Sequence, residues 1–390
     1  MLANFLGRYS RHVVSETMNA LDALDWSGGS VPTVWAYPTS FEGNPFQRLL
    51  YRRMLDHNIL IAPTNTIEAT LELQKRLPSQ VPLVVHLSWL HLVLKGSANE
   101  AEGKAAIKEY FAGLDKLKAN GAKIVWTVHN VLPHDSRLHD LEDSLNQGVY
   151  DRADLVHIMS PRTPEMCQPW FPLDSQKLWH VNHPSYHGVY PSWQTKAMAR
   201  RMLNIRESDL VFVLFGAIKP YKGLDDLAAA FDRLCLEVSA KLVIAGETDS
   251  SPATREFLAW ASTHPSVILQ DGKVHPNEIQ NYLRCADVAV LPYKRILNSG
   301  WLKLALTFSL PVVTTADSGL VPILNDEVAE IYDAADPDGL FEALKRSSRL
   351  TSMSAVQAAS DLADSFHVDK ISEEFASQAQ AWVQTWVNDK

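Results

Sequence analysis

The segment FGAIKPYKGLDDL, residues 215–227, combines glycines and lysines in a way that suits an anionic ligand. An apolar run ends at Gly216, and a helix-like stretch follows soon after Lys219 and Lys222. Helix N-termini and lysine ammonium groups both attract negative charge. The segment therefore predicts a phosphate site; the alternative is an ordinary turn with solvated lysines.

A second segment, LNSGWLKLAL (297–306), repeats this arrangement. Asn298, Ser299 and Gly300 precede an apolar helix, where a serine hydroxyl and backbone N–H groups can hold a phosphate. Helix capping alone would explain one such loop. Two of them at the carboxyl ends of strands in one domain favour a diphosphate, because open parallel sheets bind ligands there.

The segment TVHNVLPHD (127–135) brings His129, His134 and Asp135 close together after a predicted strand. Imidazole and carboxylate groups at this place suit a general base, which must lie within hydrogen-bond reach of an attacking hydroxyl. The two histidines could also bind a metal, although no third ligand has a suitable spacing. The remaining alternative is that all three residues brace a loop.

Two further segments each allow two interpretations. DPD (336–338) has the spacing of an Asp-x-Asp metal site, but it precedes GLFEALKR and is better explained as a helix N-terminus. NPFQRLLYRRMLDH (44–57) places Arg48, Arg52 and Arg53 among apolar residues. It is either an ordinary amphipathic helix or a basic, apolar surface for anionic lipid.

The elements that would position these groups alternate between short β-branched runs and longer amphipathic stretches. This alternation predicts an α/β fold of parallel sheets covered by helices on both faces. The predicted strands are residues 31–38, 58–63, 81–88, 122–130 and 154–160 in the first half, and 210–216, 240–246, 266–270, 287–293, 311–316 and 329–334 in the second.

The pattern is interrupted around residues 184–209, which predicts a linker between two Rossmann-like domains facing across a cleft. We expect an N-terminal acceptor-binding domain over 1–195 and a C-terminal nucleotide-sugar-binding domain over 205–368. The amphipathic segment 369–390 is expected to be a helix that crosses back to the first domain. A chain of 390 residues is long enough for two such domains.

Bulk composition excludes several classes of protein. The formal charge of −9 argues against a general nucleic-acid binder. Three widely spaced cysteines suggest neither a disulfide framework nor a zinc site. No apolar run approaches the roughly 20 residues of a membrane span, and the N-terminus lacks the features of a signal peptide. A cytoplasmic location is expected, at the inner face of the membrane if the acceptor is a lipid.

The order of TVHNVLPHD, FGAIKPYKG and LPYKRILNSG…LALTFSLPVV resembles that of GT-B glycosyltransferases. It is particularly similar to the inverting β-mannosyltransferases that use GDP-mannose in xanthan-type exopolysaccharide assembly, and NPFQRLLY resembles the first acceptor-side helix of that group. The resemblance covers nearly the whole chain after residue 30. It implies a donor in the C-terminal domain, an acceptor in the N-terminal one, and no metal or cofactor beyond the nucleotide-sugar.

The resemblance also assigns residues. Lys222 falls at the family's phosphate-contacting lysine before glycine, and Gly216 at the glycine that ends the first strand of that domain. The arginine that commonly follows this glycine is Ala217 here, so Lys219 is expected to supply its charge.

Many retaining members of the family carry two glutamates where this chain has Ile296 and Leu304. Their loss favours an inverting transfer, which needs a base on the acceptor side. Asp135 falls where the similar β-mannosyltransferases carry an acidic residue, and His129 corresponds to a histidine that contacts the donor sugar.

The sequence therefore predicts a glycosyltransferase that moves a hexose, mannose by resemblance, from a nucleotide diphosphate to a glycan or lipid-linked oligosaccharide. Glu42, Asn44 and His134 are predicted substrate-binding residues, and Glu42 and His129 are the alternative bases. A retaining or UDP-glucose- or UDP-glucuronate-dependent transferase, a nucleotide-sugar 2-epimerase, and a binding subunit without a base are the alternatives.

Overall fold

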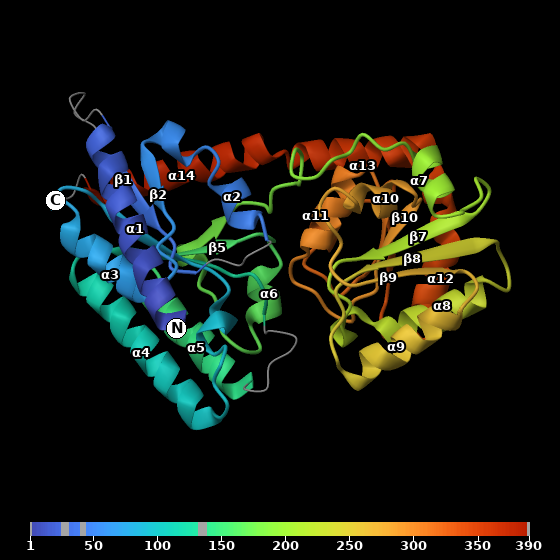
Figure 1. Cartoon of the computed structure of the whole chain (residues 1–390), viewed down its shortest axis with the longest axis horizontal. Helices are drawn as coiled ribbons and strands as arrows, with labels where there is room; N and C mark the ends of the chain where they lie inside the picture. The colour runs from blue at the N-terminus through green and yellow to red at the C-terminus, as the bar shows by residue number, and fades with distance from the viewer. Residues whose placement is uncertain (1, 25–30, 40–43, 132–138, 388–390) are drawn as a thin grey trace. The chain divides into compact units, whose positions relative to one another are not determined.

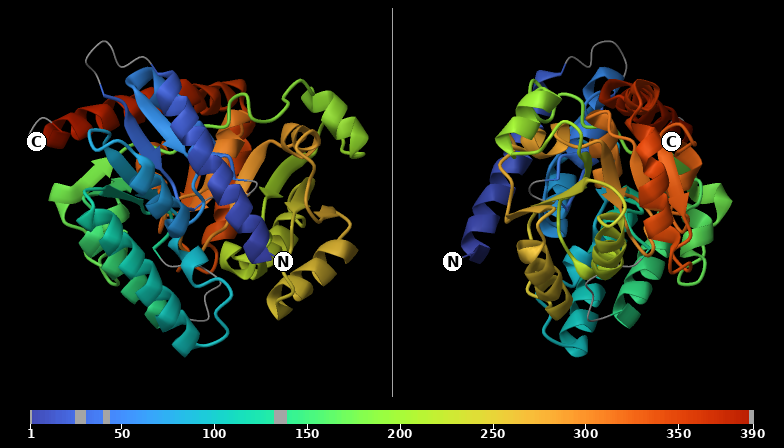
Figure 2. Two further views of the ribbon diagram at one scale, coloured as in Figure 1. Left: turned by 60° about the vertical axis from the view of Figure 1, so that its left-hand side comes forward. Right: turned by 90° about the vertical axis from the view of Figure 1, so that its right-hand side faces the viewer.

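The computed structural model describes residues 2–24, 31–39, 44–131 and 139–387, which form two compact units. The first unit comprises Met1–Asn182 with Val368–Lys390, and the second comprises His183–His367. Each unit is a parallel sheet with helices on both sides (Figure 1, Figure 2). The predicted α/β class is confirmed.

The sheet of the first unit has the strand order β2-β1-β3-β4-β5-β6, with every neighbouring pair parallel. Its central strands are buried along their length, so their sequences are mainly apolar. The strands are β1 (Thr33–Ala36), β2 (Ile59–Ala62), β3 (Leu83–Leu87), β4 (Lys123–Thr127), β5 (Leu155–Ile158) and β6 (Leu178–His180).

The helices of the first unit form two groups. Four of them pack in series, α1 (Leu2–Ala23), α3 (Ile67–Arg76), α4 (Glu100–Ala119) and α5 (His139–Arg152). In the other group α14 (Val368–Val387) packs on α2 (Phe46–Leu50) and on the short 3₁₀ turn η1 (Met54–His57). The remaining helical segments are α6 (Thr163–Cys167), η2 (Leu90–Val93) and η3 (Ser175–Lys177).

Helix α14 is attached to the first unit by aromatic stacking and hydrogen bonds. Phe375 stacks on Trp179 with ring centroids 4.3 Å apart. The Ser372 hydroxyl donates to the carbonyl of Leu50 and accepts from the backbone N–H of Arg53, both at 2.8 Å. A segment from the end of the chain thus completes the packing of a fold that begins 300 residues earlier.

The arginines of segment 44–57 take part in the same contact. Arg52 pairs with Asp369 at 3.0 Å, and Arg53 lies 3.8 Å from Glu373, both acids being on α14. The apolar side of the segment, including Phe46 and Leu50, is buried. These contacts favour the ordinary amphipathic helix over a lipid-binding surface. No helix among the described residues has the length and apolar character needed to span a membrane.

The sheet of the second unit has the order β12-β11-β10-β7-β8-β9 and is also parallel throughout. Its strands are β7 (Leu210–Phe215), β8 (Ala240–Gly246), β9 (Val267–Asp271), β10 (Val288–Leu291), β11 (Val312–Thr315) and β12 (Ala329–Tyr332). Its helices are α7 (Lys196–Met202), α8 (Leu224–Leu234), α9 (Pro252–Thr263), α10 (Ile279–Arg284), α11 (Gly300–Thr307), α12 (Gly339–Arg346) and α13 (Met353–Ser365), with 3₁₀ turns η4 (Pro220–Lys222), η5 (Val321–Ile323) and η6 (Ser347–Thr351).

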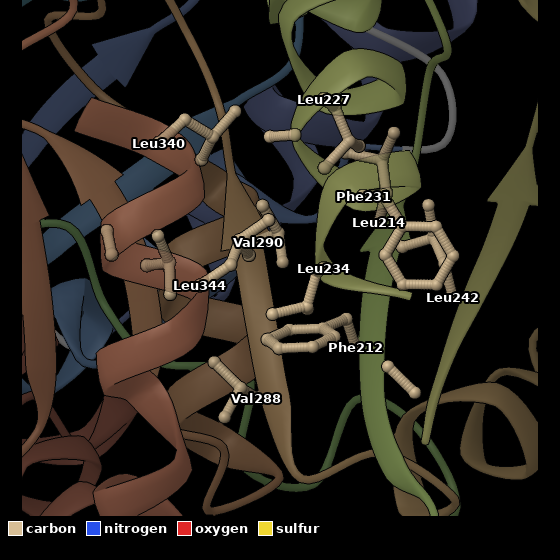
Figure 3. Packing of buried hydrophobic residues seen from close by; sticks show 14 of the residues in the cluster. Phe212, Leu214, Leu227, Phe231, Leu234, Leu242, Val288, Val290, Leu340 and Leu344 are labelled. Carbon is tan, nitrogen blue, oxygen red and sulfur yellow. The ribbon is translucent and has the colours of Figure 1, made fainter. Parts of the chain in front are cut away.

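One side of this sheet is covered by α8, α9 and α12, which enclose a core around Phe212, Phe231, Val290 and Leu344 (Figure 3). Elsewhere in the unit α11 packs against α13, and α10 packs against α7. Residues 184–209, expected as a linker, belong to this second unit, where the buried Arg200 guanidinium donates to Asp287 at 2.7 Å.

Candidate functional site

Four loops meet at the carboxyl ends of adjacent strands in the second unit. Beyond the ends of β7 and β8, Ile218 and Thr248 form an isolated parallel bridge, and beyond β10 and β11, Ile296 and Ser318 form another. The loop from β7 therefore runs beside the loop from β8, and the loop from β10 beside that from β11. Both predicted phosphate segments lie in this group of loops.

Glycines let these loops approach one another closely. Gly223 has φ +67, and a Cβ there would lie 2.1 Å from the carbonyl oxygen of Pro292 in the β10 loop. A Cβ on Gly246 would lie 1.9 Å from the carbonyl oxygen of Gly216, which itself has φ +89. Side chains at these positions would separate the loops, so the glycines are required by packing as well as by backbone conformation.

Lys222 is buried beneath the β7 loop. Its side chain is at the centre of the predicted phosphate segment, the residue is 3% exposed, and Nζ donates to the carbonyl of Phe215 at 2.9 Å. Burial, aided by the neighbouring charge of Lys219, lowers the pKa of Lys222 to about 7. The amine is therefore poised to gain a proton when a negative charge is placed beside it.

Lys219 precedes η4 and is half-buried. It interacts electrostatically with Asp249 of the β8 loop. Burial raises the pKa of the Asp249 carboxyl, but hydrogen bonds from Thr254 and Ser251 outweigh burial and, with the charge of Lys219, lower it. The β8 loop thus places the carboxylate of Asp249 near Lys219.

The β10 loop leads into α11 through Ser299, whose hydroxyl caps the helix by accepting from the N–H of Leu302 at 3.2 Å. The hydroxyl of Tyr293 lies 3.3 Å from Ser299 Oγ, and burial raises the pKa of Tyr293 to about 12. Tyr293 also stacks on Tyr221 of the β7 loop with ring centroids 5.8 Å apart. Asn298 is half-buried beside this cap.

The two positions without glutamates are apolar core positions. Ile296 and Leu304 are 5% and 6% exposed. Because both side chains are apolar and buried, neither offers a polar group to a ligand in the loops. The structure therefore places Gly216, Lys219, Lys222, Asn298, Ser299 and Gly300 on the adjoining β7 and β10 loops of one unit.

The histidine segment lies in the first unit. His129, just beyond β4, stacks on Trp89 with ring centroids 4.6 Å apart and meets the edge of Phe46 at 4.9 Å. Asn44 accepts from the backbone N–H of Phe46 at 3.0 Å, so it braces the start of α2 close to the same aromatic residue. Glu42, His134 and Asp135 lie outside the described residues.

Metal ligands do not gather in the part of the chain that the structure describes: no group of three or more His, Cys, Asp or Glu residues there could hold a metal ion. In the DPD segment, Asp336 accepts from the N–H of Asp338, and the Asp338 carboxylate pairs with Arg233. This segment is a helix N-terminus, as its sequence context indicated.

Sequence reasoning missed several residues of these loops. Gly246 ends a predicted strand in the sequence AKLVIAGETDS, and a glycine at a strand's carboxyl end was the signal available for it. Tyr293 and Tyr186 carried no comparable signal, because Tyr293 stacks on Tyr221 and Tyr186 contacts Gly300, and both of these partners are distant in the chain. Tyr186 lies so near Gly300 that a Cβ there would be 2.7 Å from its hydroxyl.

Comparison with known proteins finds similarity to glycosyltransferases. The family model described as Glycosyl transferases group 1 matches residues 209–349, which hold all four loops. An uncharacterized glycosyltransferase of Methanocaldococcus jannaschii is 26% identical over 222 residues, covering 52% of this chain and 56% of the relative. A GDP-mannose:glycolipid 4-beta-D-mannosyltransferase of Xanthomonas campestris is 26% identical over 292 residues, covering 68% of this chain and 72% of the relative.

Solved structures share the fold. Sucrose-phosphate synthase from Thermosynechococcus elongatus superposes with a TM-score of 0.70 at 13% identity, over 91% of this chain and all of that one. Anabaena HepE in complex with UDP and glucose superposes with a TM-score of 0.63 at 13% identity, over 90% of this chain and all of that one.

The fold is that of the GT-B glycosyltransferases, as the sequence resemblance implied. Residues 209–349 match the family model of group 1 glycosyl transferases, and the two relatives are glycosyltransferases by name. The alignment spans a little over half the length of the archaeal relative.

Proposed function

We propose that the protein transfers mannose from GDP-mannose to a glycan or lipid-linked oligosaccharide, with inversion at the anomeric carbon and without a metal or other cofactor. The observation that carries the proposal is the buried Lys222 amine among the adjoining β7 and β10 loops of a group 1 domain. The name of the Xanthomonas relative supports mannose and a glycolipid acceptor.

In the proposed reaction, an acceptor hydroxyl attacks the anomeric carbon while the bond from that carbon to the diphosphate oxygen breaks. The hydroxyl proton passes to the base, for which Asp135 is the first candidate, and the bond electrons leave on the diphosphate. Lys219, Lys222 and the N–H groups of the first turn of α11 would neutralise the departing charge. His129 would contact the donor sugar.

Inversion is supported by Ile296 and Leu304. Both side chains are buried in the apolar core of the second unit, so the polar contacts made by two glutamates in many retaining relatives have no counterpart at these positions. A one-step displacement from the opposite face requires no such pair.

The experiment is to incubate the protein with GDP-mannose, excess EDTA and a lipid-linked glycan extract, and to determine the anomeric configuration of the product by NMR. A β-mannoside is expected. An α-mannoside would refute inversion, and activity lost to EDTA would refute metal independence. Transfer only from UDP-glucose or UDP-glucuronate would refute GDP-mannose as the donor. Epimerisation of the nucleotide-sugar without transfer would refute the transferase reaction and indicate an epimerase.

The proposed base has a separate test. Asp135→Asn should bind GDP as the native protein does, while transfer falls by about 10²–10⁴-fold, the usual contribution of a general base. The control is Asp140→Asn, the same change at an exposed carboxylate of α5, which should leave transfer unchanged. Turnover close to normal in Asp135→Asn would move the assignment to Glu42 or His129.

A further inference from the structure

Tyr186 lies along the whole of α11. Its backbone N–H donates to the hydroxyl of Thr307, in the last turn of the helix, at 3.0 Å. Its own hydroxyl reaches the first turn, where a Cβ on Gly300 would be 2.7 Å from it. The residue is anchored at one end of the helix and presents its hydroxyl at the other.

This contact explains why position 300 is glycine. Gly300 is not one of the glycines with positive φ, so backbone conformation does not demand it. The Tyr186 oxygen is what disfavours a side chain here, because a Cβ 2.7 Å from it would force the tyrosine side chain to shift. The hydroxyl therefore stands against the turn whose backbone N–H groups have no partners within the helix.

A buried amine lies on the same side of α11. Lys303 follows Gly300 by three residues and precedes Thr307 by four, which is the spacing of one helix face. It is 3% exposed, its Nζ is among the buried atoms of the described residues without a hydrogen-bond partner, and it lies over the ring of Phe366.

The Tyr186 hydroxyl and the Lys303 amine can both donate a hydrogen bond to an anion. Burial raises the pKa of the Tyr186 hydroxyl, which keeps its proton at physiological pH. Burial lowers the pKa of the Lys303 amine well below its ordinary value, and a nearby negative charge would restore its proton. An amine without a hydrogen-bond partner is costly to bury, and a bound anion would offset that cost.

We propose that the Tyr186 hydroxyl donates a hydrogen bond to the distal phosphate of the donor diphosphate at the first turn of α11, with Lys303 supplying positive potential behind it. The proposal rests on the proposed function and deepens it: a residue from the segment preceding the group 1 domain selects nucleoside diphosphates over monophosphates.

Calorimetric titration of the full chain with GDP, UDP, GMP and UMP tests this inference. Tyr186→Phe removes only the hydroxyl and should weaken binding of the preferred diphosphate by about tenfold or more, as expected for a hydrogen bond to a charged group. Binding of the matching monophosphate should be unchanged. The control is Tyr190→Phe, which loses the same group from a ring stacked 6.1 Å away and should change neither affinity.

Two further variants separate ligand binding from folding. Gly300→Ala should cause the same loss as Tyr186→Phe, and the double variant should lose no more than either. Lys303→Met should raise the thermal midpoint, because it removes a buried amine, and yet weaken diphosphate binding.

Several results would overturn the inference. They are diphosphate affinity within twofold of normal in Tyr186→Phe, an equal loss of monophosphate affinity, and unchanged diphosphate affinity in Lys303→Met. If the native protein bound no nucleoside diphosphate at all, the proposed function itself would be refuted, and the inference with it.

Discussion

At the scale of single residues, Lys222 is the residue whose protonation state should change most when the donor binds. Its pKa is lowered to about 7, chiefly by burial, so above that pH the amine is largely neutral. A diphosphate beside it favours the charged form and raises the pKa. Binding must then take up a proton between pH 7 and the pKa of the complex.

This gives a prediction on pH. GDP affinity should fall as pH rises from 7 to 9, and titration at pH 8 in HEPES and in Tris should report proton uptake from the difference in heat. Lys222→Met should weaken binding by about 10-fold or more and abolish the uptake. The exposed Lys345 on α12, changed to Met, should leave both unchanged. Proton uptake that persists in Lys222→Met would assign the titration to another group.

At the scale of elements, the site depends on loops pressed together at the ends of strands. Gly223 closes η4 and opens α8 while its backbone lies against Pro292, so it joins the β7 and β10 loops. A side chain there meets two obstacles, a left-handed backbone and a fixed carbonyl. The second obstacle cannot be relieved by rotating a side chain.

We expect Gly223→Ala to lower the free energy of unfolding by about 2 kcal/mol or more and to weaken nucleotide binding. Gly188→Ala is the matched control, because Gly188 has a similar φ of +75 but no atom within 4 Å of its Cβ position. It should cost about 1 kcal/mol, the backbone strain alone. Urea unfolding of both variants measures the two changes in the free energy of unfolding. Equal losses of stability would show that the contact between Gly223 and Pro292 is not tight.

At the scale of the whole chain, a buried hydrogen-bond chain crosses the first sheet beneath α14. Trp35 donates to Nδ1 of His86, so His86 is neutral and its Nε2 donates to Thr127 at 2.6 Å. Thr127 in turn donates to Nδ1 of His157, whose Nε2 donates to the carbonyl of Val181. The ring of Phe375, from α14, stacks on His86 with centroids 5.8 Å apart.

Both histidines are kept neutral in the fold. Burial lowers the pKa of His157 to about 4 and that of His86 well below its ordinary value. The unfolded chain therefore binds more protons than the folded chain between pH 6.5 and about 4, so stability is complete above pH 6.5 and is lost as pH falls.

The thermal midpoint should consequently drop over this range, and hydrogen exchange at pH 5 should increase in α14 relative to pH 7.5. His157→Gln should flatten the dependence, whereas His12→Gln, at an exposed position, should preserve it. A midpoint independent of pH between 7.5 and 4.5 would contradict the neutral network.

Much of the fold could be read from the order of the residues. Buried parallel strands are apolar on both faces, so the runs at 31–38 and 210–216 identified β1 and β7 without any knowledge of packing. The three-residue strand β6 was missed because LWH has no run long enough to give a signal. The phosphate loops were found because glycine and lysine next to a strand end are local features.

Tertiary structure decided what those local features touch. The sequence placed Lys222 in a phosphate segment, but the fold shows it buried with its amine donating to the carbonyl of Phe215. It showed basic residues at 44–57, but the fold gives Arg52 and Arg53 acidic partners on α14, more than 300 residues away. The fit of Tyr186 against Gly300 likewise has no local signature. Such contacts depend on how strands and helices pack in three dimensions, whereas a sequence pattern reports only the conformation and burial of neighbouring residues.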